Sequence, residues 1–188
     1  MFKEFYQENF NSQMPLPFPL EECEFEQCQF VGVDFKNLNL SHARFIDCHF
    51  ENCDLSNGQL NNTKFLSPLF SHCKMIGIDW NQSNDLINPQ FIECILNYSS
   101  FAGMKLKKMS FKGSQLHDVD FTQADLSESN LDETDLLNTR FNSSILVKSS
   151  FVGAINYHIN PLSNKIKGAK FSLPEAIGLL ADFDVIIK

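Results

Sequence analysis

The sequence lacks both a stretch that could cross a membrane and a surplus of positive charge. Its apolar runs fall well short of the roughly 18 residues that a spanning helix needs. The N-terminus, from Met1 to Glu8, is acidic and has no apolar core of a secretory signal. The net charge of −8 should repel nucleic acid and anionic lipid, and it favours a partner with a basic groove. We therefore expect a cytoplasmic protein without direct nucleic-acid or membrane contact.

Catalytic motifs are also missing. The chain has no glycine-rich phosphate loop. His49 beside Cys48 and His72 beside Cys73 are the neighbouring base and nucleophile pairs. In each pair we expect the thiol to point inward and the imidazole outward, which prevents activation of the thiol. We expect a non-enzymatic protein with no catalytic residues and no cofactor.

What the chain does have is a large apolar residue at every fifth position, here called the beat residue. The beat runs from Leu20 to Trp80, shifts by one inserted residue before Leu86, and continues to Phe151. A period of five fits neither a helix nor a strand, whose side chains repeat at 3.6 and 2.0 residues. The chain is therefore expected to turn a corner at each beat. The polar residues from Trp80 to Leu86 predict a small surface bulge.

The position two residues before each beat residue usually holds a small side chain. Alanine, serine or threonine fills it in many pentads. The six cysteines all occupy this position: Cys23, Cys28, Cys48, Cys53, Cys73 and Cys94. Cysteine behaves there as a small apolar residue, and its spacing does not match zinc motifs. We expect neither a metal site nor disulfides in a cytoplasmic chain.

Two inward-pointing positions per pentad predict a solenoid. Four pentads close one coil of twenty residues, and successive coils stack at about 4.8 Å. Beat residues that lie twenty positions apart, or twenty-one across the inserted residue, fall into four columns. Each column holds mostly one or two kinds of large apolar side chain. One column reads Phe30, Phe50, Phe70, Phe91, Phe111, Leu131 and Phe151. The pattern predicts roughly six to seven coils.

These pentads resemble those of the pentapeptide repeat proteins, whose consensus is Ala, Asp or Asn, and Leu, followed by two variable residues. Residues 124–128, Ala-Asp-Leu-Ser-Glu, match it outright, and 53–57, 129–133 and 134–138 come close. The resemblance covers residues 20–155 and implies an all-β fold, the right-handed quadrilateral β-helix. An N-terminal segment at 1–19 and a C-terminal capping or dimerisation segment at 156–188 would flank it.

In the C-terminal segment we expect a short helix. Ser172 and Glu175 form a capping-box pair with Pro174 in the first turn, and a short strand is expected at 183–187. This tail is similar to that of the quinolone-resistance branch, the Qnr, MfpA and McbG proteins, in which it holds two chains end to end. The resemblance implies a homodimer with an interface of Ile177, Leu179, Leu180 and Phe183. The longer loops that project from Qnr coils are absent.

Between Lys112 and Arg140 the chain carries acidic side chains and no lysine or arginine. This acidic band consists of Asp118, Asp120, Asp125, Glu128, Asp132, Glu133 and Asp135. A second cluster, Glu21, Glu22, Glu24 and Glu26, lies at the opposite tip. Members of the resistance branch mimic B-form DNA on gyrase and topoisomerase IV. The resemblance therefore implies a binding protein that occupies the DNA groove of a type II topoisomerase through the acidic band, and protects the enzyme from quinolones or toxins.

The alternative hypothesis is a rigid scaffold or protein-interaction module with an unrelated partner. In that case the outward acids only keep the rod soluble and unstacked.

Overall fold

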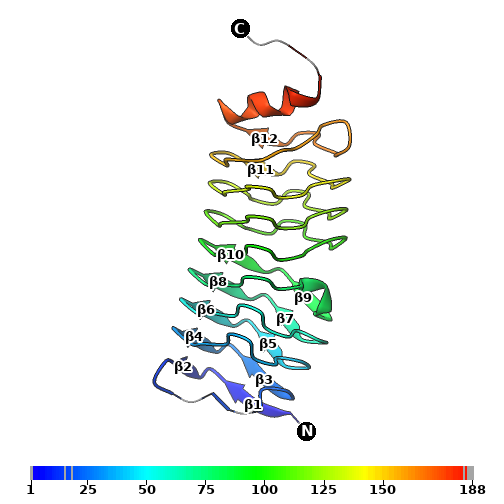
Figure 1. The fold of residues 1–188 in the computed structure, drawn as a ribbon. Helices are drawn as coiled ribbons and strands as arrows, with labels where there is room; N and C mark the ends of the chain where they lie inside the picture. The colour runs from blue at the N-terminus through cyan, green and yellow to red at the C-terminus, as the bar shows by residue number, and fades with distance from the viewer. Residues whose placement is uncertain (1, 15, 18, 184, 186–188) are drawn as a thin grey trace.

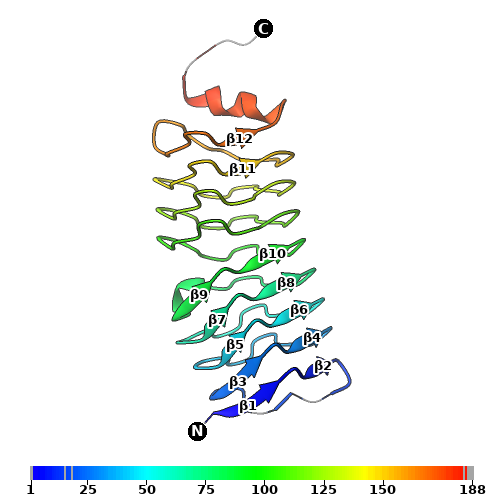
Figure 2. The ribbon, with the colours of Figure 1, turned by 180° about the vertical axis from the view of Figure 1, so that it is seen from behind.

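The computed structural model describes residues 2–14, 16–17, 19–183 and 185. The chain winds into a parallel β-solenoid of about eight turns, with a short helix at its C-terminal end (Figures 1 and 2). Residues 3–6 and 175–183 lie at opposite ends of the rod (Figure 1). This architecture confirms the right-handed quadrilateral β-helix that the resemblance implies. In the described part of the chain, no helix is long and apolar enough to span a bilayer.

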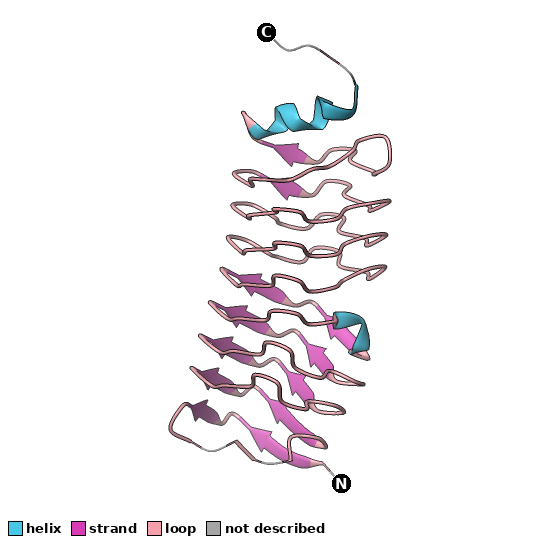
Figure 3. Cartoon of the chain, in the orientation of Figure 1, coloured by secondary structure: helices cyan, strands magenta, loops and turns pink. Residues whose placement is uncertain are grey.

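Two sheets of parallel strands form two sides of the N-terminal half (Figure 3). The first contains β1 (Lys3–Tyr6), β3 (Cys23–Glu26), β5 (Arg44–Ile46), β7 (Lys64–Leu66) and β9 (Asp85–Ile87). The second contains β2 (Asn9–Asn11), β4 (Gln29–Val31), β6 (His49–Glu51), β8 (Leu69–Ser71) and β10 (Gln90–Ile92). Nearer the C-terminus, β11 (Ser150–Phe151) pairs with β12 (Lys170–Phe171). The 3₁₀ helices are η1 (Trp80–Gln82) and η2 (Glu175–Phe183).

The strand register confirms the predicted columns. Phe30 pairs with Phe50 at a step of twenty residues, and Phe70 pairs with Phe91 at a step of twenty-one across the inserted residue. The rings of Phe30 and Phe50 stack with centroids 4.8 Å apart and planes 11° apart. Both rings are fully buried. Stacked aromatic pairs contribute roughly 0.5–1.5 kcal/mol beyond the burial of their apolar area, so each column is a continuous source of stability.

The corners are made by a left-handed residue two positions after the beat residue. Asn37 has φ +58° and Gly77 has φ +69°. At many corners the next residue donates to the beat residue's carbonyl, as Leu38 does to Phe35 at 3.0 Å. A positive φ at the third residue of such a turn is typical of type II turns. Glycine and asparagine adopt this conformation at low cost, which explains their frequency at this position.

The inserted residue forms the small surface bulge that the sequence predicts. The backbone of the bulge forms the 3₁₀ turn η1. Oδ1 of Asp79 caps this turn by accepting a hydrogen bond from the Asn81 amide at 3.1 Å. The side chain of Trp80 stays buried, stacked on Phe101 with centroids 5.7 Å apart. The bulge therefore leaves the column inside the rod intact.

The solenoid extends beyond residues 20–155 at both ends. Within the segment 1–19, β1 and β2 pair with β3 and β4 and place Phe5 and Phe10 at beat positions. In the segment 156–188, Lys165 bridges to Ile145 and β12 pairs with β11. The sequence pattern did not reveal these turns, because irregular segments separate their beat residues from the regular run. These extensions account for the larger number of turns.

The C-terminal helix is present as η2, but the predicted capping box is not formed. The hydroxyl oxygen of Ser172 instead accepts a hydrogen bond from the Gly153 amide at 2.8 Å. This contact ties the start of the cap to the coil beneath it. The strand expected at 183–187 is wrong at Phe183, which belongs to η2. Residues 184, 186 and 187 of that expected strand lie outside the described residues.

Candidate binding surface

Each pentad presents three side chains to solvent, at the positions just before, just after and two after the beat residue. The acidic band occupies these positions, so its seven carboxylates all point outward. However, the band does not form one continuous patch. Asp118 to Asp135 span almost one whole turn of twenty residues, and the chain therefore distributes them over all four sides of the rod. Residues that are adjacent in sequence end up facing in different directions.

Stacking also brings basic side chains next to the band. The expected segregation of acids from bases exists along the chain, but coils one turn apart are neighbours in space. Five of the seven band carboxylates lie close to a basic side chain. The pairs are Lys107 with Asp125 at 3.2 Å, Lys108 with Glu128 at 4.0 Å, Lys112 with Glu133 at 3.6 Å, Arg140 with Asp120 at 2.9 Å, and His117 Nε2 with Asp135 Oδ2 at 2.8 Å.

These contacts stabilise the ionised carboxylates. Partial burial alone would raise the pKa of Asp120, but hydrogen bonds from Thr122 and Arg140 outweigh it and leave the pKa below its usual value. Burial acts in the same way on Asp125, where bonds from Ser127 and Lys107 lower the pKa. Asp120 and Asp125 therefore stay ionised at neutral pH, and four of the seven band carboxylates lie within 4.0 Å of a lysine or arginine nitrogen.

Asp135 has the same balance of effects. Burial raises its pKa, while a hydrogen bond from Asn156 and the adjacent His117 lower it below the usual value. Asp132 accepts the Val152 amide at 2.8 Å. Asp118 has no ion pair with any described residue. Asp118 and Asp132 are thus the two band carboxylates without a basic partner.

The net negative charge lies in the opposite half of the rod. Residues 1–60 contain ten acidic and three basic side chains, a balance of −7, whereas residues 61–188 contain thirteen and twelve, a balance of −1. Among the described residues of the first part, the ion pair is that of Glu24 with Arg44, at 3.0 Å. We define the N-terminal acidic surface by five acids without such a pair on the two coils of residues 20–55, where they lie on three sides of the rod: Glu26, Asp34, Asp47, Glu51 and Asp54.

Two of these carboxylates recur at one position of successive coils. Asp34 and Asp54 occupy the same position of successive turns and bridge in register. Their backbones are therefore about 4.8 Å apart, a spacing of the same order as that of phosphates along one DNA strand. The glutamates near residue 24 stand out in the sequence, but this surface was not predicted from it. A count of charges by thirds of the chain would have found it.

The inward small positions hold the cysteine side chains. All six cysteines are buried as free thiols. Burial raises the pKa of Cys48 to about 12. The described residues contain no cluster of three or more histidine, cysteine or carboxylate side chains suited to a metal ion. His49 Nε2 lies 3.0 Å from the Ser71 hydroxyl on the surface, whereas Cys48 donates inward to the Phe25 carbonyl.

The C-terminal end is partly apolar. Ile177, Leu180 and Phe183 are each more than 40% exposed on η2. Leu179 differs, because its side chain packs against the core of the solenoid. Three of the four residues expected at a dimer interface are thus accessible, and the fourth holds η2 onto the last coil.

The repeat geometry agrees with a comparison against protein families. A model described as pentapeptide repeat region matches residues 20–85 and 83–151. The chain belongs to the pentapeptide repeat family. A separate comparison with curated proteins finds no match.

Among solved structures, this pentapeptide repeat protein is similar to QnrB1, described as a plasmid-mediated fluoroquinolone resistance protein. Two trypsin-treated forms match with TM-scores of 0.67 and 0.65 at 16% identity, covering 99% and 100% of this chain and 100% of theirs. The full-length form matches with a TM-score of 0.63 at 15% identity, covering 97% of this chain and all of its own. At this identity the likeness shows a shared fold.

Proposed function

We propose that this pentapeptide repeat protein is a non-enzymatic binding protein that occupies the DNA groove of a type II topoisomerase and protects the enzyme from quinolones or toxins. The observation that carries the proposal is the rigid rod with a strongly acidic N-terminal third. A basic groove that accepts DNA attracts such a rod through the same long-range field. The fold shared with QnrB1, a fluoroquinolone resistance protein, supports the choice of partner.

The uncompensated carboxylates form the contact surface in this proposal. Charges that already have a basic partner give a weaker external field than charges that do not. The N-terminal acidic surface therefore contributes most of the attraction, and the acidic band contributes mainly through Asp118 and Asp132. This assignment moves the main surface away from the acidic band, where the sequence analysis expected it, to the N-terminal coils.

The exposed side of η2 supports a homodimer as part of the same proposal. Two rods joined through Ile177, Leu180 and Phe183 would carry an N-terminal acidic surface at each far end. Apolar side chains exposed together at the end of a rod are a common sign of an interface with a second copy.

The test is a supercoiling assay with DNA gyrase and topoisomerase IV in the presence of a quinolone, with the purified protein titrated in. We expect rescue of activity at about micromolar protein and inhibition at higher doses, together with direct binding that weakens as salt increases. Two variants remove equal charge. One replaces Asp34, Asp47 and Asp54 with asparagine. The other replaces the paired acids Asp120 and Asp125 with asparagine and Glu133 with glutamine.

We expect different effects from the two variants. The first should weaken topoisomerase binding by at least about tenfold, and the second by less than about threefold. The reverse order would return the contact surface to the acidic band. If the unmodified protein neither binds nor protects either enzyme, the proposal is wrong and the scaffold hypothesis applies.

A further inference from the structure

The backbone ladder of the solenoid is interrupted at one place on its side wall. On the side formed by β9, the amides of Leu86, Asn88 and Lys105 have no hydrogen-bond partner among the described residues. One turn further along the same side the equivalent bonds are present. Leu106 donates to Asp125 at 2.7 Å, and Lys108 donates to Ser127 at 3.0 Å. β9 is accordingly the last strand of its sheet, with one edge unpaired.

The interruption is local. At the same level the other sides of the rod keep their bonds, as Phe91 donates to Ser110 at 2.8 Å, Leu96 to Gln115 at 2.9 Å and Phe101 to Asp120 at 2.8 Å. Figures 1 and 2 show a wider step between β9 and the coil that follows than between other neighbouring coils. The inserted residue precedes this step directly. The rod is thus closed on three sides and open on one.

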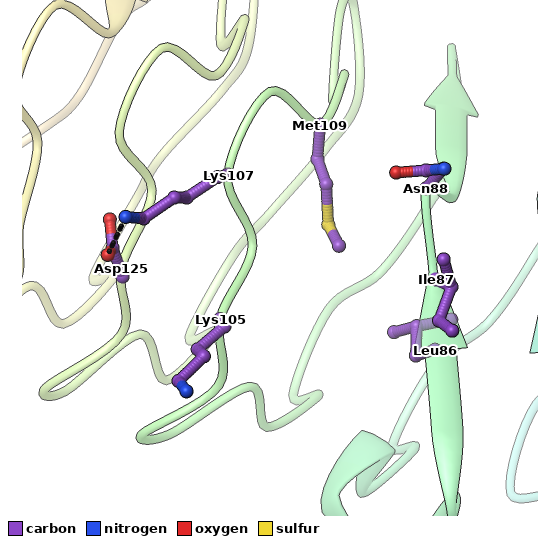
Figure 4. A pocket seen from close by; sticks show the side chains of 7 residues that line it. All are labelled: Leu86, Ile87, Asn88, Lys105, Lys107, Met109 and Asp125. Carbon is purple, nitrogen blue, oxygen red and sulfur yellow. Dashed lines mark ion pairs between the residues drawn. The ribbon is translucent and has the colours of Figure 1, made fainter.

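The opening is a groove with an apolar floor. Its volume is about 360 Å³, and Leu86, Ile87 and Asn88 line one wall while Lys105, Lys107 and Met109 line the other (Figure 4). In Figure 4 the Met109 side chain extends into the space between the two walls. Leu86 is the one beat residue from Leu20 to Phe151, all of them described, that is not fully buried. Ile87 beside it is 48% exposed.

The rim of the groove is basic. Asp125 also lines it, but its carboxylate lies 3.2 Å from Lys107 Nζ. Lys108 is similarly 4.0 Å from Glu128. Lys105 is exposed and has no ion pair with a described residue. In a chain with a net charge of −8, this local positive balance favours an acidic ligand.

We propose that the groove between β9 and residues 105–109 is a docking site for an extended acidic segment of a partner protein, which adds to the free edge of β9 as a strand. Strand addition supplies main-chain partners for edge amides, and alternate side chains of the added strand give specificity. Here the apolar side chains would lie over Leu86 and Met109, and the acidic ones would face Lys105. The proposal does not depend on topoisomerase binding.

The experiment uses the full chain labelled with ¹⁵N and a capped heptapeptide of alternating aspartate and valine. In the free protein we expect the Leu86, Asn88 and Lys105 amides to exchange with solvent at least about 100-fold faster than the Leu106 and Lys108 amides. Adding the peptide should shift the resonances of the three groove amides and slow their exchange at least about tenfold, with a Kd below about 1 mM.

Two controls separate strand addition from general attraction. Lys105→Glu should weaken binding at least about fivefold, whereas Lys74→Glu should change it less than about twofold. Lys74 is an exposed lysine at the same pentad position, but its side of the rod has an intact ladder, with its amide 2.9 Å from the Cys53 carbonyl. A peptide with N-methylated alternate amides should bind at least about tenfold more weakly.

Three results would overturn the proposal. One is slow exchange of the groove amides in the free protein, which would mean that the ladder is closed. Another is the absence of peptide binding at about 1 mM. The third is equal binding of the N-methylated peptide, which would exclude strand addition.

Discussion

Arg140 lies one turn above Asp120, and its Nη2 donates a 2.9 Å hydrogen bond to Asp120 Oδ2. The two backbones bridge in register. Twenty residues separate them in sequence, yet they are immediate neighbours along the rod. This relationship explains why a run of acids bounded by bases becomes a set of compensated pairs after folding.

Removing the partner of Asp120 gives a prediction about acid stability. In Arg140→Gln we expect the pKa of Asp120 to rise from its lowered value toward about 3.9, its ordinary value. The free energy of unfolding at neutral pH should fall by no more than about 1 kcal/mol, because the Arg140 side chain is largely exposed. Carboxyl titration by NMR and denaturant unfolding measure the two effects. An unchanged pKa would contradict the role assigned to Arg140.

The lowered pKa values of Asp120, Asp125 and Asp135 also set the direction of the pH dependence. A carboxylate with a lower pKa in the folded state stabilises the fold above its unfolded-state pKa, near 3.9. That contribution is lost as the pH falls through the folded-state pKa values. We therefore expect the free energy of unfolding to fall below about pH 4, and to fall less in a variant with asparagine at these three positions. Urea unfolding at several pH values checks this expectation.

The inward position of the beat residues is tested by a pair of aspartate substitutions. Leu126 is fully buried, and Asn142 is exposed and just follows a beat residue. Leu126→Asp should destabilise the protein by more than about 3 kcal/mol, because it places a charge in a dry column. Asn142→Asp should change stability by less than about 0.5 kcal/mol. Thermal and denaturant unfolding measure both. Equal effects would show that the inward assignment is wrong.

The cysteines predict a low thiol reactivity in the folded state. Burial raises the pKa of Cys48 to about 12, and a hydrogen bond with Cys73 together with burial raises the pKa of Cys53. Because the thiolate is the reactive form, labelling by a disulfide reagent at pH 8 should be at least about 100-fold slower than in denaturant. Raised thiol pKa values stabilise the fold below the ordinary thiol pKa of about 8.5, and this contribution is lost as the pH rises above it. Fast labelling of the native protein would contradict the burial.

Two adjacent residues of η2 allow dimer formation and fold stability to be tested separately. Leu180 is 43% exposed, whereas Leu179 packs against the core. Leu180→Asp should convert the proposed dimer to a monomer without lowering the unfolding midpoint of the monomer. Leu179→Ala should destabilise the cap by about 1–3 kcal/mol and act on assembly only through that loss. Sedimentation velocity combined with thermal unfolding distinguishes the two. A wild-type protein that sediments as a monomer would overturn the dimer.

Most of the fold was predictable, because it depends on a pattern that is local and repeated. Two inward positions in every five residues require four corners per coil, and the register of twenty follows from that count. The extra turns at the two ends were not predictable in the same way. Phe5, Phe10, Ile166 and Phe171 each lie beyond a break in the pattern, and only pairing with the adjacent coil places them in the column.

The sequence by itself determined the solenoid, its columns and the outward position of every band carboxylate, since these depend on spacing along the chain. The tertiary structure decided which charges meet. Lys108 and Glu128 are twenty residues apart and become neighbours, as do the partners of four other band carboxylates, so most of the net negative charge lies in residues 1–60. It also decided that one inserted residue near Trp80 is followed by an open ladder at Leu86. Stacking relates distant parts of the chain, and a pattern read along the chain does not contain those contacts.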